Sequence, residues 1–234
     1  MRRPSAAASP GPRPATRRVR RGLDALEARY GRPRLHRRLD PLSELVLTIL
    51  SQHTSDTNRD RAFADLRARF GTWEEVADAP RPAIERAIRK GGLARTKSAV
   101  IRDVLRHVRA ERGVMSLDHL KEQPMEEGRR WLLGLRGVGA KTAACVLLFS
   151  CGQPAFPVDT HVHRIARRLG WIPERASAEE AHLLLEAAIP PRRRLAAHVN
   201  FITLGRELCR ARRPACPECP LRRHCRHAQG WQTS

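Results

Sequence analysis

Apolar side chains recur at helical spacing along most of the chain from residue 23 onward. The segment 43–50, SELVLTIL, is apolar on nearly every side, which is typical of a helix buried at the centre of a bundle. In the segment 56–70, four apolar residues share one face: Ala62, Phe63, Leu66 and Phe70. Asp56 stands at the start of that segment and is the expected N-cap of its helix.

Two later segments carry clear helix ends. The segment 96–113 repeats apolar residues at helical spacing and stops at Gly113, and glycine commonly ends helices. The segment 177–191 opens with a capping box formed by Ser177 and Glu180, and it closes on two prolines. No alternating pattern of the length expected for a strand is found along the sequence. We therefore expect an all-α fold with roughly ten helices.

A glycine-rich turn, LRGVG, joins two expected helices at 124–134 and 139–150. Gly137 and Gly139 can adopt positive φ and let the backbone approach a ligand closely, while the second helix begins with free N–H groups. Such an arrangement binds phosphate, and the helix dipole assists. A short glycine turn is also an ordinary connection between helices, so both interpretations stay open.

The first turn of that second helix contains Lys141, one of only four lysines among 45 basic residues. An amine can perform covalent chemistry that a guanidinium cannot, which makes this lysine a candidate nucleophile. Eighteen residues later, Asp159 precedes another helical run and is a candidate N-cap whose second oxygen could act on a substrate. A chance surface lysine and a purely structural cap are the alternatives.

The net charge of +21 points to a polyanionic partner. Residues 1–22 contain seven arginines and no acid, and their Pro-, Ala- and Ser-rich composition predicts a disordered basic tail. About +14 (21 minus 7) is left for the folded remainder, so the tail alone does not explain the charge. Nucleic acid is favoured over a membrane surface. The sequence shows no signal peptide and no membrane-spanning apolar run, which predicts a soluble protein.

Four of the six cysteines lie close together near the end of the sequence: Cys209, Cys216, Cys219 and Cys225. Their spacing, Cys-x₆-Cys-x₂-Cys-x₅-Cys, favours a metal or cluster site over a disulfide framework, given that no export signal is present. A Cys-x₂-Cys pair is common to zinc and iron–sulfur sites, so the spacing leaves both open. Cys145 and Cys151 lie in an apolar stretch and are expected to be buried small hydrophobic residues.

Three of these motifs together resemble the helix-hairpin-helix DNA glycosylases, and among them the endonuclease III branch. The motifs are LRGVGAKTA, VDTHVHR and the four-cysteine segment, and the resemblance covers roughly residues 23 to 228. It implies a six-helix bundle over 34–153 and a second domain formed by 23–33 and 154–228. It also implies DNA in a cleft between the two domains and a [4Fe–4S] cluster held by the four cysteines, without a structural zinc.

The resemblance assigns chemistry to the two candidate catalytic residues. Lys141 matches the family's nucleophile, and the positive end of the helix dipole disfavours its ammonium form. Asp159 matches the family's essential carboxylate, whose negative charge stabilises a developing oxocarbenium ion and helps to activate the lysine.

The resemblance also assigns DNA contacts. Gly137 and Gly139 match the phosphate-binding hairpin, and Arg136 stands where the family commonly has proline, which adds a charge facing phosphate. The family fills the gap left by a flipped base with wedges from two loops, which match His53 and Leu93. The family's usual glutamine is displaced by one position to Gln52, so either Gln52 or His53 is the first wedge.

The implied function is that of a bifunctional glycosylase and AP lyase that removes oxidised pyrimidines from duplex DNA and nicks the strand by β-elimination. The implied protein is a monomer of the bacterial cytoplasm, associated with the nucleoid, that binds damaged double-stranded DNA. Two alternatives stay open: a mismatch glycosylase for thymine or uracil opposite guanine, and a non-catalytic DNA-binding module with a structural zinc.

Overall fold

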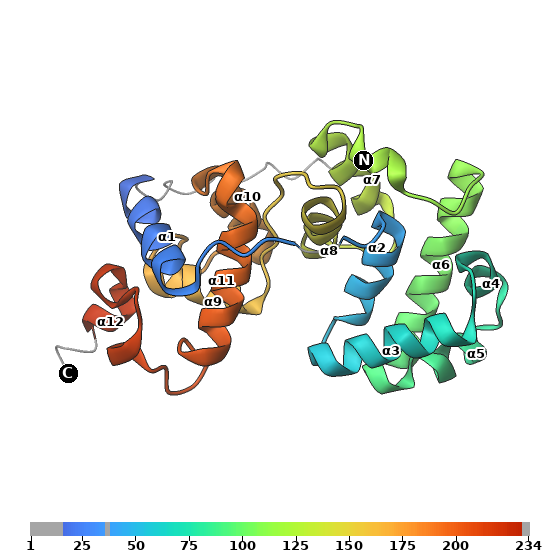
Figure 1. The fold of residues 1–234 in the computed structure, drawn as a ribbon, viewed down its shortest axis with the longest axis horizontal. Coiled ribbons are helices and arrows are strands. Elements are labelled where there is room, and N and C mark those ends of the chain that lie inside the picture. Colours follow the sequence, from blue (N-terminus) through green and yellow to red (C-terminus); the bar gives the residue numbers. More distant parts are fainter. Residues whose placement is uncertain (1–15, 36–37, 231–234) are drawn as a thin grey trace, which may run out of the picture. The chain divides into compact units, whose positions relative to one another are not determined.

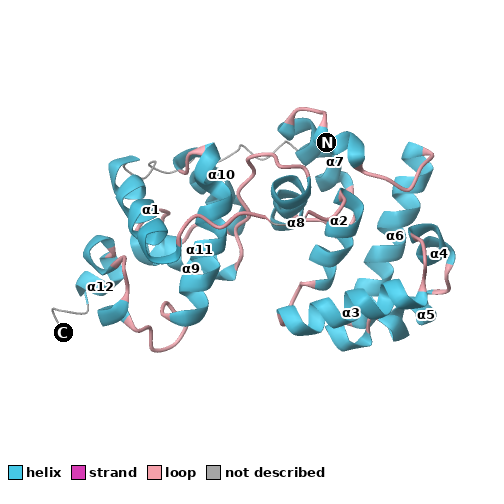
Figure 2. Cartoon of the chain, viewed as in Figure 1, coloured by secondary structure: helices cyan, strands magenta, loops and turns pink. Residues whose placement is uncertain are grey.

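The computed structural model describes residues 16–35 and 38–230, and this part of the chain is helical without a strand (Figure 2). The expected all-α fold is confirmed. Within the same residues, no helix is both long enough and apolar enough to cross a membrane. The chain divides into two compact units, one formed by Leu35–Pro157 and the other by Met1–Arg34 together with Val158–Ser234 (Figure 1).

The continuous unit contains seven α-helices: α2 (Pro41–Leu50), α3 (Asp56–Arg69), α4 (Trp73–Asp78), α5 (Arg81–Ala87), α6 (Ala94–Arg112), α7 (Met125–Gly134) and α8 (Ala140–Cys145). Short 3₁₀ turns lie at Arg89–Gly91 and Asp118–Lys121, and a π-helical segment at Val146–Ser150 continues α8. The discontinuous unit contains five: α1 (Thr16–Tyr30), α9 (Thr160–Leu169), α10 (Ala178–Ala188), α11 (Arg194–Glu207) and α12 (Arg226–Gly230). Its 3₁₀ turns are Pro191–Arg193, Cys216–Glu218 and Arg222–His224.

Helix α2 is the centre of the continuous unit, as its sequence predicts. Asp40 caps it by accepting a hydrogen bond from Ser43 N at 2.9 Å, and Pro41 occupies the first turn, where no N–H partner is needed. Its apolar side chains are buried on several sides because α3, α6 and α8 all pack against it. Glu44 and Thr48 are polar residues on this otherwise largely buried, apolar helix.

Helix α1 begins at Thr16, within the segment expected to be a disordered tail. Val19, Leu23 and Leu26 follow one another at helical spacing and are each at most 1% exposed. Their burial in the unit that contains α11 stabilises helix where the composition predicted disorder. The expected start at residue 23 is thus seven residues late, and the rest of the expected tail, residues 1–15, lies outside the described residues.

Three helix ends can be compared with the caps predicted from the sequence. Ser177 and Glu180 form the expected capping box of α10, and Gly113 ends α6 with φ +71°. The cap of α3 was assigned wrongly to Asp56. The N-cap is Ser55, whose hydroxyl accepts from Asn58 N at 3.3 Å, and Asp56 is the first helical residue.

Candidate functional site

The glycine turn between α7 and α8 has two different glycines. Gly137 adopts φ +85°, and a Cβ added there would lie 2.8 Å from the Val100 side chain, so both its conformation and its packing require glycine. Gly139 has φ −100° and ψ 179°, an extended backbone, so the expected positive φ is found only at Gly137. Apart from its own neighbours along the chain, no atom of the described residues lies within 4 Å of a Cβ added at Gly139. This end of α8 therefore leaves room beside the backbone for a ligand, and the exposed side chain of Arg136 lies in the same turn.

Lys141 is partly buried in the first turn of α8, and its amine contacts α2. Its Nζ donates a hydrogen bond to Ser51 Oγ at 3.3 Å, and the Ser51 hydroxyl donates to Thr48 O at 2.7 Å. The amine is thus held by a neutral hydroxyl instead of a carboxylate.

Glu44 lies on the same stripe of α2, one turn before Thr48. The Thr48 hydroxyl donates to Glu44 Oε1 at 3.2 Å. Burial raises the pKa of Glu44 to about 7, against the opposing effects of the Thr48 hydrogen bond and the positive charges of Arg59 and Lys141. Sequence reasoning missed this residue. The signal was a charged side chain seven positions before Ser51 in an otherwise apolar helix, because positions 44, 48 and 51 share one face.

The two expected wedge loops both contain a strained residue. His53 has φ +50° and Leu93 has φ +48°, and only one other non-glycine residue in the described ranges has a positive φ. Both side chains are exposed, and Leu93 is 55% exposed although it is apolar. Gln52 is partly buried, and its N–H closes a turn on Ile49 O at 3.3 Å. Such strain is found disproportionately at functional loops.

Asp159 is the N-cap of α9, and one oxygen performs this structural role. Its Oδ1 accepts from Val162 N at 2.7 Å. Within the described residues, Oδ2 accepts no hydrogen bond, so one face of the carboxylate is available to a ligand. Asp159 and Lys141 belong to different units of the chain.

Two arginines of α9 fasten the cysteine segment to that helix. Arg164 donates from Nε and from one Nη to Cys209 O, at 3.0 and 2.9 Å. Arg168 donates to Cys209 Sγ at 3.2 Å and to the carbonyls of Arg210 and Ala211 at 2.8 and 3.0 Å. The position of the first cysteine is therefore set by the same helix that Asp159 caps.

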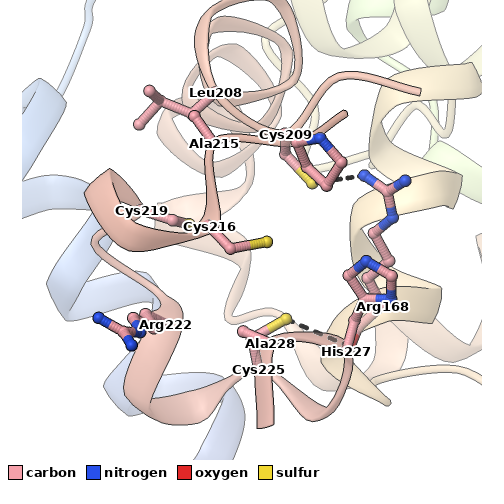
Figure 3. Close-up of a pocket in the computed structure, with 11 residues that line it drawn as sticks. Arg168, Leu208, Cys209, Ala215, Cys216, Cys219, Arg222, Cys225, His227 and Ala228 are labelled. Atoms are coloured by element: carbon pink, nitrogen blue, oxygen red, sulfur yellow. Dashed lines mark hydrogen bonds between the residues drawn. The ribbon is translucent and has the colours of Figure 1, made fainter. Parts of the chain in front are cut away.

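The four cysteines of this segment line one pocket of about 290 Å³, a volume that includes its open side. Figure 3 shows the sulfur atoms of Cys209, Cys216 and Cys225 directed into the space between the cysteine segment and α9. The cysteines form no disulfide. Burial raises the pKa of Cys219 to about 11, so binding of a metal or cluster would have to displace its proton.

The spacing of these thiols bears on what the pocket can hold. Among the described residues, no three Cys, His, Asp or Glu side chains converge closely enough to bind a single metal ion. Four thiols around one pocket nevertheless supply the full ligand set of a larger group, and Arg168 and Arg222 at its wall offset negative charge. The donors present therefore fit a four-cysteine iron–sulfur cluster.

A family model described as the HhH-GPD superfamily of base excision DNA repair proteins matches residues 46–191. The chain belongs to this superfamily, and the resemblance derived from its motifs is confirmed. Endonuclease III of Thermotoga maritima is 36% identical over 193 residues, which cover 82% of this chain and 86% of that protein. A relative in Arabidopsis thaliana, whose name assigns it provisionally to the DNA glycosylases, is 43% identical over 149 residues. That match covers 64% of this chain, which spans about half the length of the Arabidopsis relative (51%).

Solved structures agree with this assignment. A non-covalent complex of endonuclease III with DNA superposes with a TM-score of 0.80 at 29% identity, covering 94% of this chain and 99% of that one. A thermostable thymine-DNA glycosylase has a TM-score of 0.74 at 21% identity, which shows a shared fold and no more. The all-helical fold is therefore that of the endonuclease III structures.

Proposed function

We propose that this protein is a bifunctional DNA glycosylase and AP lyase that removes oxidised pyrimidines from duplex DNA. The observation that carries the proposal is Lys141, a partly buried amine at the start of α8, directly after the glycine hairpin, whose Nζ donates to the neutral hydroxyl of Ser51. A glycosylase without lyase activity needs no such nucleophile. The similarity to endonuclease III over most of both chains supports the same choice.

The first chemical step joins the lysine to the sugar. The lone pair of Lys141 Nζ attacks C1′ while the N-glycosidic bond breaks, and the departing base takes up a proton. The nitrogen then loses a proton, and its lone pair expels the ring oxygen, which takes up a proton and becomes the C4′ hydroxyl; a protonated Schiff base results. Ser51 Oγ accepts a hydrogen bond from the amine and so orients it in the free enzyme.

Strand cleavage follows from the electron demand of the Schiff base. The iminium makes a 2′ proton acidic, and loss of that proton expels the 3′ phosphate, which breaks the C3′–O bond. Hydrolysis of the remaining imine returns Lys141 as a free amine. The strand is therefore cut on the 3′ side of the lesion.

Asp159 supplies the negative charge that the sugar requires. As the glycosidic bond breaks, positive charge develops at C1′ and the ring oxygen, and a carboxylate stabilises it. Oδ1 is committed to Val162 N, which fixes the orientation of the carboxylate, while Oδ2 is available to the substrate. The capping hydrogen bond thus orients the carboxylate of Asp159 for catalysis.

The DNA-binding roles fall to the hairpin and the two loops. Gly139 leaves space for a phosphate beside the first N–H groups of α8, and Arg136 adds a positive charge in the same turn. His53 and Leu93 fill the gap left by the flipped nucleotide, because both are exposed and both are held at a positive φ. Of the two candidates for the first wedge, His53 is favoured over Gln52, which is partly buried.

Cys209, Cys216, Cys219 and Cys225 would hold a [4Fe–4S] cluster in the pocket beside α9. When bound, the cluster would act structurally, by replacing four separate thiols with one rigid cross-link of the segment. Arg168 donates a hydrogen bond to Cys209 Sγ at 3.2 Å and so contributes a positive charge beside that cysteine.

A panel of duplexes tests the proposal. Thymine glycol, dihydrouracil, an abasic site, and uracil or thymine opposite guanine are scored separately for base release and for nicking. We expect release and nicking together on the oxidised pyrimidines. Base release confined to the mismatched uracil or thymine, without nicking, would instead identify a mismatch glycosylase. Binding without any base release would indicate a DNA-binding module.

A further inference from the structure

Lys97 is a buried lysine that the catalytic scheme does not use. Its side chain is only 2% exposed, and burial lowers the pKa of its amine. Among the described residues it forms no ion pair. Its Nζ donates instead to two backbone carbonyls, Leu50 O at 2.7 Å and Gly91 O at 2.8 Å. Burying an amine that has only carbonyl partners is costly, so its position needs a reason.

The two carbonyls lie directly before the two wedge loops. Leu50 is the last residue of α2, three positions before His53, and Gly91 ends a 3₁₀ turn two positions before Leu93. The backbone of Lys97 makes a third connection, because its N–H donates to Leu93 O at 2.9 Å. One residue therefore fastens both loops at their starting points.

Both loops need such support because of their backbone conformations. Positive φ is unfavourable for a histidine or a leucine, and it persists only where the surrounding structure holds it. The side chains of His53 and Leu93 are exposed, so they add little packing of their own. The support must come from the chain beneath the loops, and this is where Lys97 lies.

We propose that Lys97 is a positioning residue that couples the two loops, so that His53 and Leu93 enter the DNA stack as a unit. The inference rests on the wedge roles proposed above. If the loops are coupled, removal of the wedge side chain from one loop also displaces the wedge of the other loop. If Lys97 is only a core residue, the two wedges act independently whether Lys97 is present or absent.

A double-mutant cycle in two backgrounds tests the coupling. The probe is a duplex with a tetrahydrofuran abasic analogue opposite 2-aminopurine, whose fluorescence rises when the base is unstacked. The analogue cannot form a Schiff base, so failure of the proposed Lys141 chemistry would not affect the result. Affinity and fluorescence are measured for His53→Ala, Leu93→Ala and the double variant, with Lys97 or with Lys97→Met.

With Lys97 present, we expect each single variant to weaken binding about tenfold, and the double variant to be hardly weaker than either. In the Lys97→Met background, the two losses should multiply to about a hundredfold relative to Lys97→Met alone. Arg106→Met is the matched control, since Arg106 also lies on α6 and donates to a backbone carbonyl, Ala77 O at 2.8 Å, away from both loops. It should leave the coupling unchanged.

Circular dichroism establishes that each variant is folded at the assay temperature. If Lys97→Met does not fold, amide hydrogen exchange in the otherwise native chain takes its place: Leu93→Ala should accelerate exchange at residues 51–54. Coupling that persists in folded Lys97→Met would overturn the inference about Lys97 and leave the proposed function intact. The same holds if Leu93→Ala does not change the exchange rate at residues 51–54. If neither wedge variant changes the 2-aminopurine signal, the wedge roles fail, and the inference fails with them.

Discussion

Lys141 Nζ and Ser51 Oγ lie 3.3 Å apart, although 90 residues separate them along the chain. The contact joins the first turn of α8 to the end of α2, and Ser51 also begins the loop that contains His53. The nucleophile and a proposed wedge loop thus share one hydroxyl group.

Removal of the hydroxyl should misplace the amine without removing it. Ser51→Ala is expected to slow borohydride trapping of the enzyme on abasic-site DNA about tenfold, because the orientation of Nζ is lost. Lys141→Ala should abolish trapping altogether, while DNA binding is retained. An intact covalent adduct in Lys141→Ala would show that another amine is the nucleophile.

The pKa of Glu44 predicts how stability depends on pH. Its pKa is about 7 in the folded chain and about 4.5 in the unfolded chain, so the folded state binds the proton more tightly. The stability that this difference provides is complete below pH 4.5 and is lost as the pH rises to about 7. Glu44→Gln should therefore raise the free energy of unfolding by about 2 kcal/mol at pH 8 and change it little at pH 4.5. Denaturant unfolding at the two pH values measures it, and an equal effect at both would contradict the assignment.

The same carboxyl group should affect the reactivity of Lys141. Above pH 7 Glu44 is a carboxylate, and the positive charge of Lys141 interacts with it electrostatically. Glu44→Gln is expected to trap abasic-site DNA about threefold faster than the native chain at pH 8, and equally fast at pH 5.5. Thr48→Val should change the trapping rate in the same direction, because loss of the Thr48 hydrogen bond raises the pKa of Glu44 further. Slower trapping by Glu44→Gln at pH 8 would instead make Glu44 the proton acceptor for the amine.

Two substitutions at Asp159 separate its structural role from its catalytic role. Asparagine can still accept the hydrogen bond from Val162 N, so Asp159→Asn should keep its stability and lose base release. Asp159→Ala should lose base release and also about 1 kcal/mol of stability, because the cap is gone. Ser177→Ala, at the cap of α10, is the control that loses a cap alone. Base release by Asp159→Asn at the native rate would exclude the carboxylate from catalysis.

The cysteine pocket predicts a coloured protein. The purified chain should contain iron and sulfide and show the broad visible absorption of an iron–sulfur cluster, and Cys219→Ser should lose it. Cys151→Ser is the comparison, because Cys151 is partly buried in the other unit and does not line the pocket. A colourless native protein with one zinc per chain would refute the cluster.

The sequence predicted most helices because their signals are local. The apolar run of α2, the capping box of α10 and the glycine after α6 each depend on residues within one or two turns. The start of α1 could not be predicted in this way. Its arginine-rich first turns resemble a disordered tail, and only burial of Val19 in the folded unit makes them helical.

The residues of the candidate site can also be divided into those with a local sequence signal and those without one. Lys141, Asp159 and the four cysteines were found because their motifs are contiguous and ordered along the chain. Glu44 and Lys97 were not found, because each acts through a residue far away in sequence: Glu44 on Lys141, and Lys97 on Leu50. Contacts of this kind exist only once α2, α6 and α8 are packed together.

Gly137 has a consequence for the residue that it touches. A Cβ at Gly137 would meet Val100 at 2.8 Å, so the contact leaves no spare space on either side. Any side chain at position 137 would therefore have to displace Val100 or the hairpin itself. Val100 lies one turn after Lys97 on α6. The same helix therefore contacts both the hairpin and the wedge loops, so a substitution in the hairpin that moved α6 would also affect the wedge loops.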